Sequence, residues 1–363
     1  MNNSIGRLFT VTSFGESHGR AVGVVVDGCP AGLALTEADI QPDLDRRRSG
    51  SSTASTPRQE KDWVEILSGV SGGYTTGAPI CLMIRNEDID DTAYEKIKSK
   101  LRPGHADYTA YVKYGGFNDV RGGGRFSGRI TATFVMAGAI ARKLLDTIGV
   151  EIIAHTVEIG GIRAKSMSFN DIKKRSGKDP LFCADSQAAG KMTELINKTK
   201  EAGDSLGGII EGIAVNVPVG LGEPVFDNLD GDLAKALLAI PAVKGVEFGL
   251  GFTSTRLKGS ENNDAFLLKD GKIVTATNNA GGILGGISNG MPLLVRVAIK
   301  PTSSIAIEQQ TVDIAKMKDT SITVGGRHDV CIVPRAAPVV EAMMAVTLCD
   351  FAMRAGLIPR VLK

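Results

Sequence analysis

Short apolar runs bounded by glycine or polar residues predict strands along much of the chain. Such runs cover residues 22–26, 80–84, 213–219 and 293–299. Their length and their content of β-branched residues are typical of strands buried in a sheet. We therefore expect a core built from strands that lie far apart in the sequence.

A glycine pattern of constant spacing precedes three of these runs. It occupies residues 72–77, 207–212 and 285–290, with glycine at the first, second and sixth positions. Each copy is interpreted as a hairpin or bulge that leads into a buried strand. Three similar units favour a sheet core built by duplication, although shared turn chemistry without common descent would give the same spacing.

Longer stretches with apolar positions three and four residues apart predict helices. Residues 128–145 are apolar almost all round, so their helix should be buried. Residues 185–202 are amphipathic and are followed by Gly203, a common helix end. Residues 337–355 have Pro338 near the start and a glycine just past the end.

One more helix is predicted over residues 36–48, where Thr36 and Asp39 provide a cap and Pro42 is an unexplained breaker. Helices and strands alternate along the chain, which indicates a layered α+β fold. The Ser- and Thr-rich residues 49–56 follow three arginines, and we interpret them as a mobile flap over a site rather than as a linker.

Charge and composition exclude several classes of protein. The 42 basic and 40 acidic residues give a net charge of +2, which is too balanced for a general nucleic-acid binder. An RNA-binding protein is disfavoured further by the five Tyr, the one Trp and the lack of a recognisable RNA-binding motif. The longest apolar run, residues 130–141, is shorter than the roughly 20 residues that span a bilayer.

The N-terminus lacks the apolar core of a signal peptide, so we expect a cytoplasmic protein without a membrane segment.

The cysteines are odd in number, widely separated and without a C-x-x-C pair. This pattern disfavours a zinc site and favours buried free thiols. The cysteines are Cys29, Cys81, Cys183, Cys331 and Cys349.

Arginine, glycine and histidine gather at five places in the sequence. Arginine offers forked, permanently charged donors to phosphate and carboxylate, and glycine lets backbone N–H groups approach an anion. Histidine can move protons near neutral pH. The clusters lie at residues 15–19, 46–48, 102–107, 121–129 and 327–335. Together they indicate a site that binds a polyanion and transfers protons on it.

The first cluster, Gly15-Glu16-Ser17-His18-Gly19, matches the G-x-S-x-G nucleophile elbow of hydrolases letter for letter. An elbow requires a helix after the serine, whereas a strand-like run follows here. We therefore disfavour a hydrolase and interpret His18 as a general acid or base in a sharp turn. His155, in contrast, lies in an apolar strand-like segment and is interpreted as a structural histidine.

Residues 121–129 resemble a phosphate loop in mechanism, because three consecutive glycines and three arginines lie at the start of a buried helix whose N-terminus favours anions. No Gly-Lys-Ser/Thr sequence is present there, so ATP hydrolysis is disfavoured. In the third cluster, the turn at Pro103-Gly104 can project Arg102 and His105 the same way, with Asp107 nearby.

Two further segments carry candidate chemistry. Residues 300–304, a lysine and three hydroxyls around a proline, end a predicted strand and could hold a phosphate or a flavin edge. His328 and Asp329 precede a strand-like run at residues 330–333 and could form an oriented base. Adjacent residues of a strand point oppositely, so one should face the site and the other support it.

The joint order of these motifs closely resembles the chorismate synthase family. The motifs are Gly-Glu-Ser-His-Gly, Leu-Asp-Arg-Arg-Arg, Arg-Pro-Gly-His-Ala-Asp, Arg-Gly-Gly-Gly-Arg, Lys-Pro-Thr-Ser-Ser and Arg-His-Asp, together with the segment at 278–288. The resemblance runs from Gly6 to about Phe351 and implies a single catalytic domain over residues 1–363. It also implies a β-α-β sandwich, with the Gly-rich strand units around buried helices, and a homotetramer.

The resemblance implies an activity as well. The family converts 5-enolpyruvylshikimate-3-phosphate into chorismate and phosphate by a 1,4-anti elimination, the last step of the shikimate pathway. The reaction needs reduced FMN without net redox change. The alternative that we keep is a flavin-dependent oxidoreductase using the same anion site, which would consume reduced flavin. The sequence leaves open whether the chain reduces FMN itself with NADPH or depends on a separate flavin reductase.

Residue roles follow from the resemblance position by position. It implies that His18 protonates the leaving phosphate, that His105 sets the protonation state of reduced flavin, and that Asp329 helps flavin N5 accept the substrate proton. Ser17 and Ser127 would orient these groups. The expected substrate anchors are Arg47, Arg48, Arg102, Arg129 and Arg327, and the expected FMN contacts are Arg47, Arg125, Phe126, Ser127, Ala242, Gly285, Lys300, Pro301, Thr302, Ser303, Ser304 and Arg327.

The chain departs from the family pattern in three places. Thr53 stands where a second basic residue is often found, and Arg58 could substitute for it. Phe126 replaces the first serine of Arg-Ser-Ser, and Pro241 replaces the asparagine of Asn-Ala. If the flavin contacts there are made by the backbone, binding survives, but the departures put flavin affinity in doubt.

Overall fold

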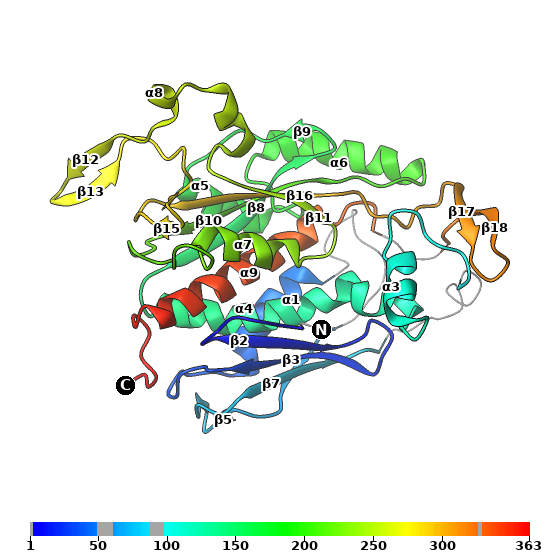
Figure 1. Ribbon diagram of the computed structural model, residues 1–363, viewed down its shortest axis with the longest axis horizontal. Helices are drawn as coiled ribbons and strands as arrows, with labels where there is room; N and C mark the ends of the chain where they lie inside the picture. The colour runs from blue at the N-terminus through cyan, green and yellow to red at the C-terminus, as the bar shows by residue number, and fades with distance from the viewer. Residues whose placement is uncertain (1–2, 49–60, 88–97, 326–328) are drawn as a thin grey trace.

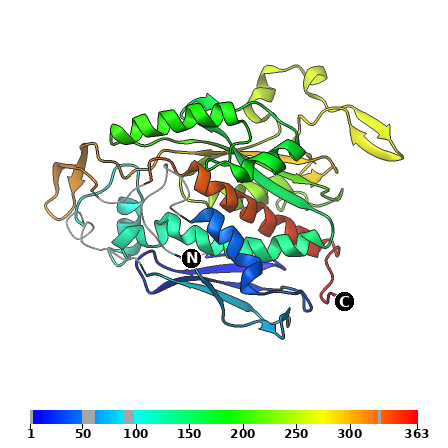
Figure 2. The same cartoon turned by 180° about the vertical axis from the view of Figure 1, so that it is seen from behind.

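A three-layer β-α-β sandwich forms the body of the protein, with helices enclosed between two sheets (Figures 1 and 2). The computed structural model describes residues 3–48, 61–87, 98–325 and 329–363. The layered α+β fold that the sequence predicts is thereby confirmed. One apolar core runs through the helical layer and onto the inner faces of both sheets.

Within the described residues each large sheet has five strands, all paired antiparallel. The first sheet has the order β1 (Ser4–Ile5), β2 (Thr10–Gly15), β3 (Ala21–Asp27), β7 (Ile80–Arg85) and β4 (Val64–Ile66). The second has the order β11 (Val243–Phe248), β16 (Leu293–Ile299), β10 (Gly208–Val215), β8 (Glu151–Ile159) and β9 (Ile162–Arg163).

Two-stranded hairpins decorate these sheets. They are β5 (Val70–Ser71) with β6 (Tyr74–Thr75), β12 (Phe266–Lys269) with β13 (Lys272–Thr275), β14 (Ile283–Leu284) with β15 (Ile287–Ser288), and β17 (Gln309–Asp313) with β18 (Lys318–Ile322). The β12–β13 hairpin projects from the body as an arm (Figure 1).

The helices divide between the inside and the outside of the sandwich. The inner ones are α1 (Glu37–Arg47), α4 (Thr131–Asp146), α7 (Leu229–Leu238) and α9 (Val333–Arg354). The others are α3 (Asp107–Tyr114), α5 (Phe169–Arg175), α6 (Ser186–Glu201) and α8 (Gly259–Asn262), with short 3-10 turns η1 (Arg121–Phe126), η2 (Gly128–Ile130), η3 (Ser176–Lys178) and η4 (Gly251–Arg256).

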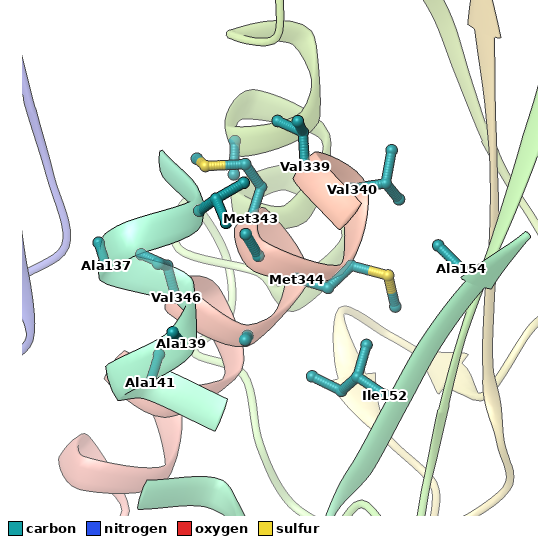
Figure 3. Packing of buried hydrophobic residues seen from close by; sticks show 14 of the residues in the cluster. Ala137, Ala139, Ala141, Ile152, Ala154, Val339, Val340, Met343, Met344 and Val346 are labelled. Carbon is teal, nitrogen blue, oxygen red and sulfur yellow. The ribbon is translucent and has the colours of Figure 1, made fainter. Parts of the chain in front are cut away.

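The contact between α4 and α9 is the centre of the core (Figure 3). Small residues let the two helices approach closely, because a Cβ added at Gly138 would lie 2.3 Å from the Cβ of Ala342. Helix α9 is long and apolar enough to cross a membrane, but 94% of its most apolar window is buried inside the protein. It is therefore explained as the core helix of the sandwich.

Most predicted strands are confirmed. The runs at 22–26, 80–84 and 293–299 fall in β3, β7 and β16. The run at 213–219 needs correction, because β10 begins earlier and ends at Val215.

The three glycine units lead into strands, as predicted, but by different geometry. Two form the hairpin turns of β5–β6 and β14–β15. The middle unit forms a bulged strand opposite β8. A Cβ at Gly212 would lie 2.4 Å from the sulfur of Met344, so this glycine allows β10 to pack on α9.

The predicted helices at 128–145 and 185–202 correspond to α4 and α6, and Asp185 caps α6 through its carboxylate. The strand expected at 330–333 is wrong, because α9 already begins at Val333 with a proline in its first turn. Pro334 suits a helix start, and it outweighs the β-branched residues beside it. Pro338 consequently lies inside the helix, not near its start as predicted.

We predict that Gly138→Ala destabilises the protein by about 1–3 kcal/mol, because the added methyl group overpacks the contact between α4 and α9. Gly190→Ala is the matched control, since Gly190 lies on the exposed face of α6 with open space around it. The control should be neutral or stabilising by up to about 1 kcal/mol. Urea unfolding of both variants tests this, and equal stability of Gly138→Ala and the wild type would contradict the packing.

Candidate active site

A cavity of about 590 Å³ opens at one end of the helical layer. Its walls come from both halves of the chain: the turn after β2, the end of α1, the loops at 102–106 and 122–131, the segment at 238–244, the loop after β16 and the start of α9. The volume lies in the range of about 300–1,000 Å³ that is typical of small-molecule sites.

The cavity brings together most residues that the sequence singled out. Those that line it are Ser17, His18, Arg47, Arg48, Arg102, His105, Arg125, Phe126, Ser127, Arg129, Ala242, Lys300, Pro301, Thr302, Ser303, Ser304 and Asp329. Pro241, a departure from the family pattern, also lines it. Gly285 does not; it is exposed in the β14–β15 turn. Arg327, His328, Thr53, Arg58 and the flap at 49–56 lie outside the described residues.

The turn between β2 and β3 carries Ser17 and His18, both buried. A strand follows this turn, so the hydrolase elbow is excluded, as expected. The Ser127 hydroxyl donates to the Ser17 hydroxyl at 3.1 Å. A Cβ at Gly122 would lie 2.4 Å from Nε2 of His18, and Gly122 has φ +57°, so only glycine fits against the imidazole.

The three arginines of the glycine-rich loop differ in their roles. Arg121 pairs with Asp119 outside the cavity lining. The Arg125 guanidinium donates to the carbonyls of Gly15 at 3.0 Å and Ser13 at 3.2 Å, and so ties the loop to β2. Arg129 is buried in the cavity wall, where its guanidinium can bind a ligand anion.

His105 is oriented by Asp107, which also holds Arg102. The Asp107 carboxylate lies 2.6 Å from Nδ1 of His105 and accepts from Nη2 of Arg102 at 2.7 Å. Burial alone would raise the pKa of Asp107, but its hydrogen bonds to His105 and Arg102 outweigh that and lower it. With Asp107 ionised, we assign the Nδ1 proton to the bond with Asp107, which leaves Nε2 for the cavity.

Asp62 forms the ionic centre of the site. Its carboxylate accepts from Nη2 of Arg47 at 2.6 Å and from Nη1 of Arg129. Burial opposes ionisation of Asp62, but the two guanidinium groups dominate and lower its pKa to about 2. Asp62 has φ +51°, the left-handed conformation that aspartate tolerates better than most residues.

Arg47 is almost fully buried and carries an incompletely compensated charge. Burial is the main cause that lowers its pKa to about 10; the attraction of Asp62 opposes this shift, whereas repulsion from Arg335 and Arg129 adds to it. Its Nε is buried without a hydrogen-bond partner among the described residues. An anion bound in the cavity would supply both the missing acceptor and the missing negative charge.

Asp329 and Arg335 stand on another wall of the cavity. Arg335 donates to the Asp329 carboxylate at 2.5 Å and to the Arg47 carbonyl at 3.2 Å. The hydroxyl of Thr302 donates to the Asp329 carbonyl at 2.9 Å. Asp329 is thereby fixed between the loop after β16 and the start of α9.

The residues around the loop after β16 suit a flat cofactor that bears a phosphate. Ile240, Ala242 and Val339 provide an apolar wall for a ring system. Lys300 donates to the Gly104 carbonyl at 2.6 Å, and the hydroxyls of residues 302–304 follow it. Burial and the neighbouring Lys244 lower the pKa of Lys300, and the negative charge of a phosphate would oppose this shift.

Sequence reasoning missed two polar residues of the site. Asp62 lines the cavity, and Asn86 holds the His18 turn and accepts from Arg129. Both stand outside the arginine and histidine clusters. The only available signal was general: buried arginines require an acidic partner.

Comparison with known proteins agrees with this geometry. The family model described as chorismate synthase matches residues 9–353. Chorismate synthase of Dehalococcoides mccartyi is 59% identical over 363 residues, with 100% of both chains covered. That of Methanosarcina mazei is 54% identical over 361 residues and 99% of each chain. A crystal structure of chorismate synthase matches with a TM-score of 0.76 and 32% identity, over 97% of this chain and 93% of that one.

These matches extend over nearly the whole chain, and they agree with the sequence motifs and with the layered fold. The chain therefore belongs to the chorismate synthase family.

Proposed function

We propose that the protein eliminates phosphate from 5-enolpyruvylshikimate-3-phosphate to give chorismate, with reduced FMN bound in the same cavity. The observation that carries this proposal is the convergence of His18, His105 and the Arg47–Asp62–Arg129 group on one cavity. Since residues from Ser17 to Val339 line that cavity, we infer that residues 1–363 act as one catalytic domain.

The charges of the cavity match those of the ligands. The substrate carries one phosphate and two carboxylates, and FMN adds a further phosphate. Arg47 and Arg129 share the single carboxylate of Asp62, so together they retain positive charge for a ligand anion. Arg48, which lies 3.6 Å from the exposed carboxylate of Asp45, and Lys300, which donates to a backbone carbonyl, add two further cations to the cavity.

The two histidines are placed for different proton transfers. His18 lies beside the glycine-rich loop, where it can protonate a leaving phosphate that Arg47 and Arg129 hold. His105 presents Nε2 near Gly123, at the edge of the imidazole opposite the nitrogen that contacts Asp107. When bound, reduced FMN would supply electron density to the allylic system, and the Asp329 carboxylate, paired with Arg335 on the cavity wall, is available as a proton acceptor.

A flavin-dependent oxidoreductase is the alternative, and it is not favoured, because the family relationship extends over the whole chain.

We further infer from the family that the protein is a cytoplasmic homotetramer. It would obtain reduced flavin either by reducing FMN itself with NADPH or from a separate reductase.

The experiment that tests the proposal measures anaerobic release of phosphate and chorismate with reduced FMN, oxidised FMN or no flavin. The proposal predicts release only with reduced flavin, and far less than one flavin oxidised per turnover. Folded protein that makes no chorismate with reduced flavin would overturn it. Stoichiometric oxidation of flavin would instead support the oxidoreductase.

We predict that His18→Gln lowers kcat by about 10²- to 10⁴-fold, the usual contribution of a general acid. His155→Gln is the matched control, because His155 is also buried but lies in β8 away from the cavity lining. Steady-state assays on folded protein should show nearly unchanged kcat for the control. Wild-type turnover by His18→Gln would show that His18 does not carry the proton transfer.

The ion pairs of Asp62 predict how stability depends on pH. The folded pKa of about 2 lies below the unfolded value of about 3.9, so the ionised group stabilises the fold above pH 4. This stabilisation, about 2–3 kcal/mol, should disappear as the pH falls from about 4 to about 2. Asp62→Asn should therefore be less stable than the wild type at pH 7, with a difference that narrows over that range.

Urea unfolding between pH 7 and pH 2.5 checks this expectation. Asp270→Asn is the control, because Asp270 also has a left-handed backbone, with φ +51°, but is exposed in the β12–β13 turn. The control should follow the wild type at every pH. A stability difference between Asp62→Asn and the wild type that stays constant with pH would contradict the ionic role of Asp62.

A further inference from the structure

Asn86, the residue that follows β7, connects two parts of the site without lining the cavity itself. Its side-chain amide donates to the carbonyl of Gly19 at 2.8 Å and to that of Glu16 at 3.1 Å. Its side-chain oxygen accepts from Nε of Arg129 at 2.9 Å. Its backbone N–H donates to the carbonyl of Arg20 at 3.1 Å.

These bonds fix the turn that carries Ser17 and His18. The two carbonyls that accept from Asn86 flank that pair in sequence, so one amide group closes the turn from both ends. A further bond inside the turn runs from the Gly19 N–H to the Glu16 carbonyl at 3.1 Å. Asn86 is thus the link between the His18 turn and the end of β7.

The same side chain orients Arg129. The guanidinium uses Nη1 for Asp62 and Nε for Asn86, two partners that meet different edges of its plane. A planar donor fork held at two edges cannot rotate about its long axis. Since Asp62 also binds Arg47, the position of Asn86 is coupled to the whole arginine group.

We propose that Asn86 is a positioning residue that holds the proton donor, His18, in register with the anion anchor, Arg129. An amide is suited to this because it donates on one side and accepts on the other. Asparagine therefore connects two carbonyls and a cation, whereas a carboxylate matches only the cation and an apolar side chain matches neither. The inference rests on the proposed elimination for the role of His18, but not for the role of Arg129.

Two substitutions of similar size separate the two contacts. Asn86→Asp keeps an acceptor for Arg129 and places an anionic oxygen against the two carbonyls. We expect kcat to fall by about 10- to 100-fold, the scale of buried hydrogen bonds lost with a partner left unsatisfied. Binding of inorganic phosphate, measured by calorimetry, should also weaken in this variant, because the added carboxylate offsets the positive charge of Arg129.

Asn86→Leu removes both contacts. We expect the same fall in kcat and, in addition, phosphate binding weakened by about tenfold, because Arg129 loses the acceptor that orients it. The stoichiometry of phosphate binding reports the fraction of competent protein in each sample. A merely structural role would change that fraction, but it would leave the phosphate affinity of competent Asn86→Leu protein at the wild-type value.

Asn278→Asp is the matched control, because the Asn278 amide also donates to a carbonyl, that of Pro292, at 2.8 Å, but lies outside the cavity lining. It should keep wild-type kcat and phosphate affinity. Wild-type kcat in Asn86→Asp, wild-type phosphate affinity in Asn86→Leu, or an equal kcat loss in the control would overturn the inference. If the wild type made no chorismate, the proposed function would fail, and the phosphate affinities would still decide the role in orienting Arg129.

Discussion

The burial of two guanidinium groups against one carboxylate is the constraint on which this site depends. Arg47 and Arg129 come from separate helical segments and are almost fully buried, and Asp62 between them makes that burial tolerable. Burying a cation without a counter-charge destabilises the folded protein by several kcal/mol. Two hydrogen-bonded arginines that share one carboxylate avoid much of this cost and still retain a net positive charge that attracts a ligand anion. The shared carboxylate therefore makes this group both stable and ready to bind.

The helical layer fixes the position of this group. Arg46, next to Arg47 on α1, makes two bonds of 2.6 and 2.9 Å to Glu341 of α9. Glu341 also accepts from the backbone N–H of Ala154 in β8 at 2.9 Å. Helix α1, helix α9 and the second sheet are thus joined one residue away from the site. This tie also accounts for the helix that continues through Pro42, because tertiary contacts outweigh the local cost of the proline.

Much of the fold and most of the cavity-lining residues can be predicted from the sequence. Buried strands and helices leave periodic patterns, and arginine, glycine and histidine motifs mark the loops that line the cavity. Asp62 and Asn86 leave no such pattern, because their roles come from contacts with residues distant in sequence. The start of α9 is predicted wrongly because the β-branched residues there are typical of a strand, and only the packing of the whole helix overrides that preference.

The central claim is that one cavity, built around the Arg47–Asp62–Arg129 group, holds both the substrate and the flavin. A crystal structure with 5-enolpyruvylshikimate-3-phosphate and FMN bound tests it most directly. The account predicts substrate anions on Arg47 and Arg129 with Asp62 still bridging them, and the FMN ring and phosphate along Ala242 and the loop after β16. Ligands bound outside this cavity, or Asp62 displaced from both arginines, would contradict it.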